Sequence, residues 1–183
     1  MDFPKLFNLI HPDFFDDPDI KGLPQDYVFT EMILDLRNEI PCPLPPCPAN
    51  ITFGEYHGEL KKLLAAVALV EDDWVQFFSD KTKVFCAFDG NTIAAVCILS
   101  DWGTFAGLQI GGPGCVGTVP EFRCQGIGLE MVRQATAILR DEGFDLSWIH
   151  YTYLEKWYSK IGYHTVLRWN CKGFILLRKF FTG

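Results

Sequence analysis

The stretch VPEFRCQGIGLEMV, residues 119–132, constrains the fold of this chain more than any other segment. A β-rich apolar run, CVGTV, leads into it, and a run with helical spacing, LEMVRQATAILRDEG, leaves it. Between the two runs, Arg123, Gly126 and Gly128 are spaced as R-x-x-G-x-G. A helix N-terminus exposes unpaired amide N–H groups and a partial positive charge, which together attract anions such as phosphate. The stretch therefore predicts a strand–turn–helix unit that binds an anion.

Glycine suits these two positions because an anion can approach closely a backbone that carries no Cβ. Arg123 adds a guanidinium group that can contact the same anion. Two other phosphate-binding loops fit less well. No Lys-Ser or Lys-Thr follows the glycines, as the nucleotide P-loop requires, and no third glycine completes the dinucleotide fingerprint G-x-G-x-x-G. A glycine turn that merely packs a helix on a sheet is the alternative explanation.

The remaining segments predict a mixed α/β fold. Apolar runs bounded by turn residues predict strands at 27–36, 51–56, 115–119, 144–153, 164–170 and 174–181. Two more strands within 83–101 are joined by Asp89-Gly90, a dipeptide that favours a hairpin. Helical spacing predicts helices at 58–70, 71–78, 127–141 and 154–161. The glycine-rich segment 102–114 is expected to be a long loop.

A proline-rich run at 41–48, PCPLPPCP, is expected to separate an N-terminal extension, residues 1–48, from a domain at 49–183. Proline lacks the amide donor and fixes φ, so this run suits neither a helix nor a central strand. The extension carries many aromatic groups, such as Phe7 and Phe14, so we expect it to be ordered against the core. Covering an edge strand, shaping a substrate pocket and forming a homodimer contact are its three open roles.

Composition argues against several classes of protein. The formal net charge is −7, whereas a nucleic-acid-binding protein normally shows a basic patch. No apolar run approaches the roughly 20 residues that span a bilayer, and the acidic, proline-broken N-terminus is unlike a signal peptide. The seven cysteines lie mostly in apolar runs and lack zinc-ligand spacing, which is typical of reduced proteins. We expect a cytoplasmic protein with no metal, membrane or nucleic-acid partner.

The motif V-P-E-F-R-C-Q-G-I-G at the end of a strand resembles the acetyl-CoA-binding motif of the GCN5-related N-acetyltransferase (GNAT) family. A second segment, LEKWYSKIGY at 154–163, is similar to a later family segment that commonly ends in Tyr-x-x-x-Gly-Phe or Gly-Tyr. The resemblance lies in motifs over 115–163 and in element order over 51–183. It implies an α/β fold of the acyl-CoA N-acyltransferase type, in which helices flank a central mixed, mostly antiparallel sheet.

The resemblance also implies a binding site for acetyl-CoA. The preceding strand would pair with the pantetheine arm, and the glycine turn would hold the pyrophosphate through backbone amides. The residues carried over are Gly117, Thr118 and Val119 on the strand, Arg123 and Cys124 at the start of the turn, and Gln125, Gly126, Ile127 and Gly128 within it. The family often has an asparagine several residues before its tyrosine, where this chain has Tyr151, so that contact is not implied.

Acetyl transfer needs a proton to leave the acceptor ammonium, whose pKa is about 10.4, and a proton to reach the leaving thiolate. Tyr158 stands where the family often places the acid that protonates the thiolate. His150 is the candidate base, although the sequence favours a hydrogen-bonded structural histidine there. Because strand side chains alternate between faces, only one of His150 and Tyr151 is expected to point into the cleft. Asp101 and Trp102 are candidates for the border of an acceptor pocket.

The function that the resemblance implies is N-acetyl transfer, by direct attack of a primary amine on the thioester of acetyl-CoA. A non-catalytic sensor or scaffold of the same fold, which binds an acyl-CoA without turnover, is the alternative. The presence of Tyr158 favours the enzyme. The acceptor stays open between a small-molecule amine and an amine of a protein.

Overall fold

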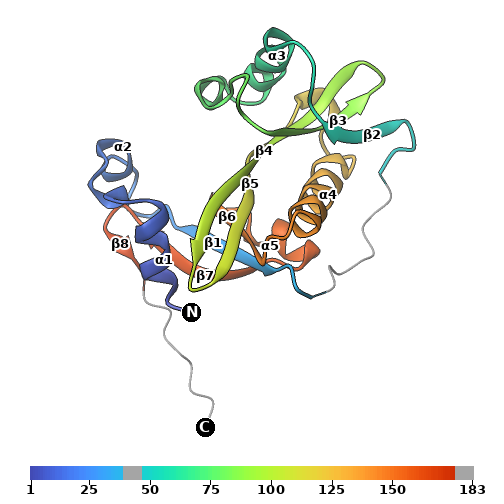
Figure 1. Ribbon diagram of the computed structural model, residues 1–183. Coiled ribbons are helices and arrows are strands. Elements are labelled where there is room, and N and C mark those ends of the chain that lie inside the picture. The colour runs from blue at the N-terminus through green and yellow to red at the C-terminus, as the bar shows by residue number, and fades with distance from the viewer. Residues whose placement is uncertain (39–46, 176–183) are drawn as a thin grey trace.

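Eight strands form one sheet in the computed structural model, which describes residues 1–38 and 47–175 (Figure 1). The strands are β1 (Phe29–Asp35), β2 (Ile51–Glu55), β3 (Val84–Asp89), β4 (Thr92–Phe105), β5 (Leu108–Thr118), β6 (Leu146–Thr152), β7 (His164–Asn170) and β8 (Gly173–Phe174). Their order across the sheet is β2-β3-β4-β5-β6-β1-β7-β8. Every neighbouring pair is antiparallel except β5 and β6, which are parallel. The predicted mixed, mostly antiparallel sheet is confirmed.

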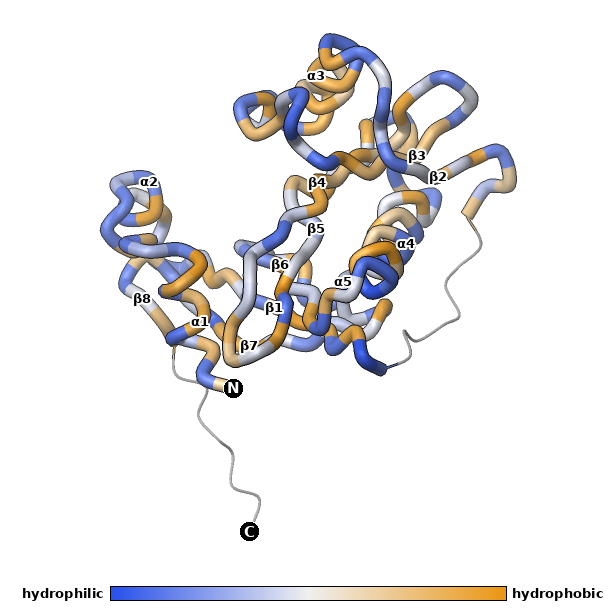
Figure 2. Tube along the Cα trace, in the orientation of Figure 1, coloured by the Kyte–Doolittle hydropathy of each residue, from blue (hydrophilic) through white to orange (hydrophobic). Residues whose placement is uncertain are grey.

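Helices cover both faces of this sheet. The α-helices are α1 (Phe3–Ile10), α2 (Pro18–Lys21), α3 (Leu60–Val70), α4 (Ile127–Asp141) and α5 (Glu155–Tyr158), and the 3₁₀ turns are η1 (Phe14–Asp16), η2 (Asp72–Phe77), η3 (Pro120–Phe122) and η4 (Ser159–Ile161). On one face, Met131 and Val132 of α4 pack in a core with Met32 of β1 and Ile149 of β6. Hydrophobic and hydrophilic residues alternate along α4 in Figure 2, as an amphipathic helix requires.

The opposite face is covered in two halves. Phe7 of α1 packs in a core with Ile33 and Trp148, while Val67 of α3 packs in a separate core with Val96. Because side chains alternate along a strand, Ile33 and Met32 point to opposite faces of the sheet. The middle of this face, over β4 and β5, lies between the half that α1 covers and the half that α3 covers (Figure 1).

The N-terminal segment belongs to the sheet itself. Strand β1 lies between β6 and β7 and pairs with both of them. Leu6 and Phe7 of α1 are 1% and 0% exposed, which agrees with the expected order of this segment against the core. The domain boundary at residue 48 stays a prediction, because most of the proline-rich run lies outside the described residues.

Several predicted elements match closely, and others were wrong. The helix at 127–141 and the strand at 164–170 have the predicted bounds, and the turn at Asp89-Gly90 joins β3 to β4. The segment 71–78 forms the 3₁₀ turn η2 instead of an α-helix, and α1 forms where no period was recognised. Of the strand predicted at 174–181, only Phe174 lies in β8, and residues from 176 onward lie outside the described residues.

The predicted loop at 102–114 is the largest error in the fold. These residues extend β4 and begin β5, which form one long hairpin that turns at Ala106-Gly107. Glycine is required here because β5 and β6 approach each other closely. A Cβ on Gly112 would lie 1.9 Å from the carbonyl oxygen of Trp148 on β6. Glycine in a strand marks such close approaches between backbones as well as turns.

Candidate functional site

The site begins where β5 and β6 stop pairing. These parallel strands are joined only at Ile110–Leu146 and Gly111–Ser147, near their starts. Each strand then carries a residue with positive φ, Cys115 at 46° and Tyr151 at 55°, beside a shift in register with the neighbouring strand. Such bulges redirect side chains and end regular pairing, and they are common beside active sites. Two cavities open in this region.

The glycine turn lies at the end of β5. Gly126, with φ of 81°, precedes the first residue of α4, and only glycine adopts that conformation readily. A Cβ on Gly128 would lie 2.5 Å from Thr118 Oγ1, so this glycine lets the first turn of α4 pack against β5. Each glycine therefore has a structural requirement of its own, which is compatible with the expected approach of an anion.

The first cavity, which we call the glycine-turn cavity, has a volume of about 570 Å³. It is lined by Val70, Glu71, Trp74, Val116–Thr118, Phe122–Cys124, Gly126–Leu129, Tyr153, Leu154, Trp157 and Tyr158. The structure thus brings together all the predicted cofactor residues except two. Val119 is buried and its N–H donates to the carbonyl of Ala94, and Gln125 is exposed beside the cavity.

Arg123 is held at the mouth of the turn. Its Nε donates to the carbonyl oxygen of Thr118 at 3.0 Å, while the side chain as a whole is exposed. The hydrogen bond ties the turn to the end of β5. Arg123 also belongs to the lining of the glycine-turn cavity.

Tyr158 and Trp157 both line the glycine-turn cavity, with ring centroids 4.8 Å apart. Because neighbours in a helix point about 100° apart, the sequence predicts that Tyr158 reaches the cleft while Trp157 packs in the core, and the structure instead places both in the cavity lining. Tyr158 is the more buried of the two, at 5% exposure, because α5 ends in the tight turn η4 and the ring lies in the core beside Tyr163. Burial raises the pKa of Tyr158 above its ordinary value, so the phenol keeps its proton at neutral pH.

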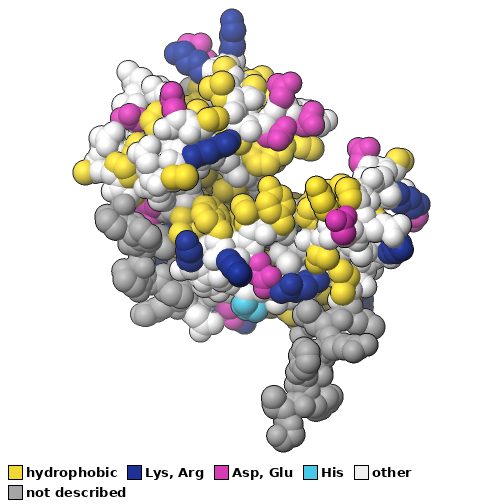
Figure 3. Space-filling view, turned by 180° about the vertical axis from the view of Figure 1, so that it is seen from behind, with side chains coloured by type: hydrophobic (Ala, Val, Ile, Leu, Met, Phe, Trp, Pro, Cys, Tyr) yellow, Lys and Arg dark blue, Asp and Glu magenta, His cyan; other side chains and the backbone are white. Residues whose placement is uncertain are grey.

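The second cavity, which we call the aromatic cavity, has a volume of about 690 Å³ and meets the first at Trp74 and Tyr153. It lies on the sheet face between the α1 and α3 sides. Its lining consists of Phe29, Trp74, Phe77, Ile98, Ser100, Trp102, Pro113–Cys115, His150, Tyr151 and Tyr153. Figure 3 shows hydrophobic side chains gathered along a hollow in the molecule.

His150 and Tyr151 both line the aromatic cavity. Strict alternation along β6 predicted only one of them there, and that prediction was wrong because the positive φ of Tyr151 interrupts the alternation. His150 Nδ1 lies 3.0 Å from Glu31 Oε2 on β1. Since a carboxylate can only accept, Nδ1 carries the hydrogen and Nε2 is left as the acceptor.

Glu31 is the residue that sequence reasoning missed. Its side chain is 0% exposed and accepts hydrogen bonds from Trp148 Nε1 and Trp169 Nε1, each at 2.7 Å. The backbone N–H of Tyr151 and the ring of His150 complete its partners. A buried carboxylate is retained only when its oxygens are satisfied in this way. A single acid inside the apolar run FTEMIL was the available signal.

His11, on the C-terminal side of α1, stacks on His150 with ring centroids 3.9 Å apart and an interplanar angle of 18°. Burial, and secondarily the proximity of His150, lower the pKa of His11 to about 3. His11 is therefore neutral at pH 7 and adds no charge beside His150. This contact ties the N-terminal segment to the aromatic cavity.

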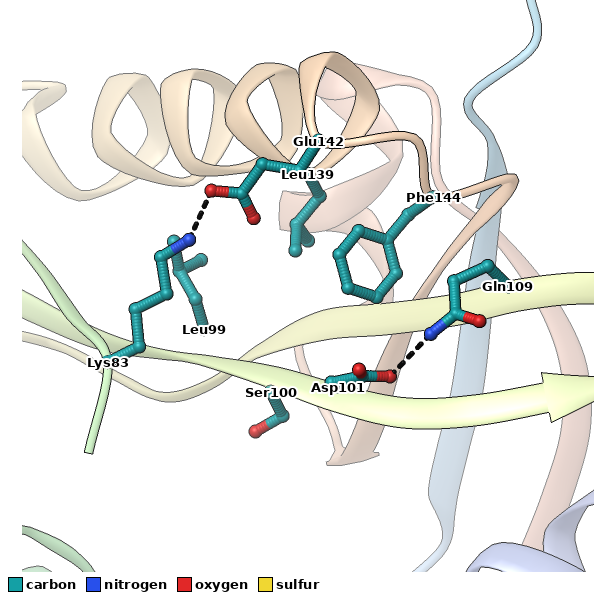
Figure 4. Close-up of a pocket in the computed structure, with 8 residues that line it drawn as sticks. All are labelled: Lys83, Leu99, Ser100, Asp101, Gln109, Leu139, Glu142 and Phe144. Atoms are coloured by element: carbon teal, nitrogen blue, oxygen red, sulfur yellow. Dashed lines mark hydrogen bonds and ion pairs between the residues drawn. The ribbon is translucent and has the colours of Figure 1, made fainter. Parts of the chain in front are cut away.

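Only one of the two predicted border residues of the acceptor pocket lies there. Trp102 lines the aromatic cavity, whereas Asp101 points to the opposite face of the sheet, into a third cavity of about 420 Å³ (Figure 4). There Gln109 Nε2 donates to Asp101 at 2.7 Å, and Lys83 pairs with Glu142 of the loop after α4. Polar groups of this third cavity are thus bonded to one another.

Among residues 1–38 and 47–175, no cluster of three or more His, Cys, Asp or Glu side chains is arranged to hold a metal ion. The same part of the chain contains no helix with the length and apolar character needed to cross a bilayer.

Comparisons with known proteins agree on one family. The family model described as the acetyltransferase (GNAT) family matches residues 50–167, whereas no curated protein matches the chain. A GCN5-related glucosamine N-acetyltransferase region in a fungal multi-domain β-N-acetylglucosaminidase is 23% identical, with a TM-score of 0.67 over 79% of this chain. GCN5-related N-acetyltransferases from Kribbella flavida and Sphaerobacter thermophilus are each 18% identical, with TM-scores of 0.51 over 76% and 0.55 over 77%.

These structural similarities show that the chain shares the fold of these proteins. The matched part spans only 20% of the fungal protein's length and 55% and 49% of the two bacterial chains.

Proposed function

The chain belongs to the GNAT acetyltransferase family, and from this premise we propose that it transfers an acetyl group from acetyl-CoA to a primary amine. One observation carries the proposal: two cavities meet at Trp74 and Tyr153, one beside a helix N-terminus and the other beside a histidine held by a carboxylate. The first suits an anionic cofactor and the second a nucleophile that must lose a proton. Their junction is where the two reactants would meet.

The glycine-turn cavity fits acetyl-CoA. The N-terminus of α4, after Gly126, offers free amide N–H groups and a positive dipole end to a pyrophosphate. Gly117 and Thr118 of β5 face the gap that β6 leaves, so their backbone can pair with an extended, amide-containing arm. Bound there, acetyl-CoA supplies an acetyl thioester as the electrophile and a thiolate as the leaving group.

His150 is proposed as the base. Its Nδ1–H is committed to Glu31, so Nε2 accepts the proton that the acceptor ammonium must lose before it can act as a nucleophile. Glu31 fixes the tautomer and orientation of the ring and stabilises the imidazolium that results, as a carboxylate does for a catalytic histidine elsewhere. The amines that such a base serves include small molecules and protein side chains.

Tyr158 is proposed as the acid. Its hydroxyl belongs to a protonated, buried phenol in the wall of the glycine-turn cavity. A phenol whose pKa is raised keeps its proton at neutral pH and can donate it in a hydrogen bond to the thiolate as negative charge develops on the leaving sulfur. Tyr158 therefore holds the proton that the leaving group takes.

Release of free thiol from acetyl-CoA tests the proposal against the sensor alternative. Purified protein should release thiol only when an amine is present, and the panel should include glucosamine because a similar structure carries a glucosamine N-acetyltransferase region. His150→Gln should lower kcat/KM by roughly 10²–10⁴. The matched control is His57→Gln, which changes a histidine whose side chain is 82% exposed and outside both cavities. Acetyl-CoA binding without amine-dependent thiol release would favour the sensor.

A further inference from the structure

The aromatic side chains that line the aromatic cavity indicate which kind of amine it can accept. Phe77, Tyr151 and Tyr153 are 55%, 36% and 76% exposed, and all three line this cavity, although Tyr153 also lines the glycine-turn cavity. Trp74 and Trp102 complete the lining of large rings. Large aromatic groups exposed together in a concave site mark a ligand surface, because each loses water-exposed apolar area when a ligand covers it. The ligand that these walls fit has a flat or apolar body.

The ionisable side chains of this lining indicate how much charge the acceptor can carry. Among the described residues that line this cavity there is no Asp, Glu, Lys or Arg. The thiol of Cys115 stays neutral because burial raises its pKa to about 11, and burial likewise raises the pKa of Tyr151. His150 is the one imidazole among the described residues of this lining.

Two acidic side chains near the aromatic cavity are paired or turned away from it. Glu31 is enclosed by its four donors, and Asp101 points to the other face of the sheet. Asp17 and Asp19 of the α2 region are exposed outside the lining, where they can attract a cation. Glu71 also lies outside this lining, in the adjoining glycine-turn cavity. Among the described residues that line the aromatic cavity, a second buried ammonium group would therefore find no counter-ion.

We propose that the acceptor is an amine with a single ammonium group on a flat, apolar body, for which an arylalkylamine is the simplest example. The inference rests on the proposed function, in which the aromatic cavity receives the acceptor. The body would lie against the rings, where an ammonium also gains from aromatic faces. Desolvation among apolar walls lowers the pKa of that ammonium and so helps His150 to remove its proton. Polyamines, amino sugars and amino acids would leave charges or hydroxyl groups unpaired there.

A matched panel of amines tests the inference with the full chain and acetyl-CoA. The panel consists of 2-phenylethylamine, spermidine, glucosamine, alanine and a lysine-containing peptide, and the measurement is thiol release together with the acetylated product. We expect kcat/KM for 2-phenylethylamine to exceed the others by about tenfold or more. A preference for spermidine, glucosamine, alanine or the peptide overturns the inference while leaving acetyl transfer intact.

Two pairs of variants test whether the preference among amines depends on the aromatic cavity. Phe77→Ala should raise KM for 2-phenylethylamine, whereas Tyr27→Ala, which truncates an aromatic residue of similar exposure outside this cavity, should not. Ser100 lies on the cavity side of β4, opposite Leu99 and Asp101 (Figure 4). Ser100→Asp adds a carboxylate to the wall and should shift preference toward spermidine, whereas Ser100→Asn should not. An unchanged preference in Ser100→Asp would contradict the argument from charge.

Calorimetry separates this inference from the proposed function. If no amine releases thiol, the proposed transfer fails, and binding alone then decides the acceptor class. Saturable binding of 2-phenylethylamine to the protein with CoA present, weakened by Phe77→Ala and not by Tyr27→Ala, keeps the inference. Absence of binding overturns it.

Discussion

The two cavities of this protein are built in different ways. The glycine-turn cavity takes most of its lining from one continuous stretch, the end of β5 and the start of α4, and its proposed binding groups are backbone amides. The aromatic cavity takes its walls from β1, η2, the β4–β5 hairpin and β6, and its proposed chemistry depends on side chains. The proposed cofactor site is thus encoded locally, while the proposed acceptor site beside it is assembled from distant segments.

Tyr158→Phe offers the strongest test of the glycine-turn cavity, because it removes the proposed proton and keeps the ring. We expect kcat to fall by roughly 10²–10⁴, with acetyl-CoA affinity nearly unchanged. Tyr163→Phe is the control. It removes another buried hydroxyl, which contacts Ser147 and Thr136, and should lower stability while leaving kcat alone. Wild-type kcat in Tyr158→Phe, measured where chemistry limits the rate, would leave solvent as the proton source.

Gly126→Asp should abolish cofactor binding without touching the aromatic cavity. Ligand binding stabilises a fold by RT ln(1 + [L]/Kd), which is about 2.7 kcal/mol at a hundredfold excess over Kd. The mutation places a side chain where φ is 81° and a negative charge at the anion site, so most of this shift should disappear. The measurement is the melting temperature with and without acetyl-CoA. A folded variant that keeps the full shift would show that the pyrophosphate binds elsewhere.

Arg123→Ala should have a smaller effect on the same cavity. The backbone amides carry most of the proposed contact, and Nε of Arg123 is already bonded to Thr118. We expect a loss of about 1.5 kcal/mol in acetyl-CoA binding, the lower end for a hydrogen bond to a charged group. Titration calorimetry measures it, and an unchanged Kd would mean that this side chain faces only solvent.

The smallest predicted effect belongs to the aromatic side and concerns pH. The pKa of His11 is about 3 in the folded protein, below its ordinary value of 6.5, so the unfolded chain binds more protons between these values. Stability contributed by neutral His11 is present above pH 6.5 and is lost as the pH falls toward 3. His11→Phe should reduce the loss of urea-unfolding free energy between pH 7 and pH 5. An identical loss in both proteins would place His11 outside the packed cluster.

Sequence patterns predicted those parts of the fold that depend on residues close together in the chain. The helix at 127–141 and the strand at 164–170 follow from periodic burial of apolar side chains, and Gly126 follows from the backbone conformation before a helix. The segment 102–114 was misassigned because the glycines that let β5 approach β6 resemble the glycines of a loop. The same residue type satisfied two different physical requirements.

The strand–turn–helix unit, the family and the residues proposed to bind an anion could be predicted from the sequence, because they depend on neighbours along the chain. Only the tertiary structure brought Glu31 to His150, across more than a hundred residues, and placed His11 on the same ring. It also decided that His150 and Tyr151 share one cavity, through a bulge that no alternating pattern reveals. Pairing of distant strands sets these contacts, and a one-residue change in register moves a side chain to the other face of a sheet.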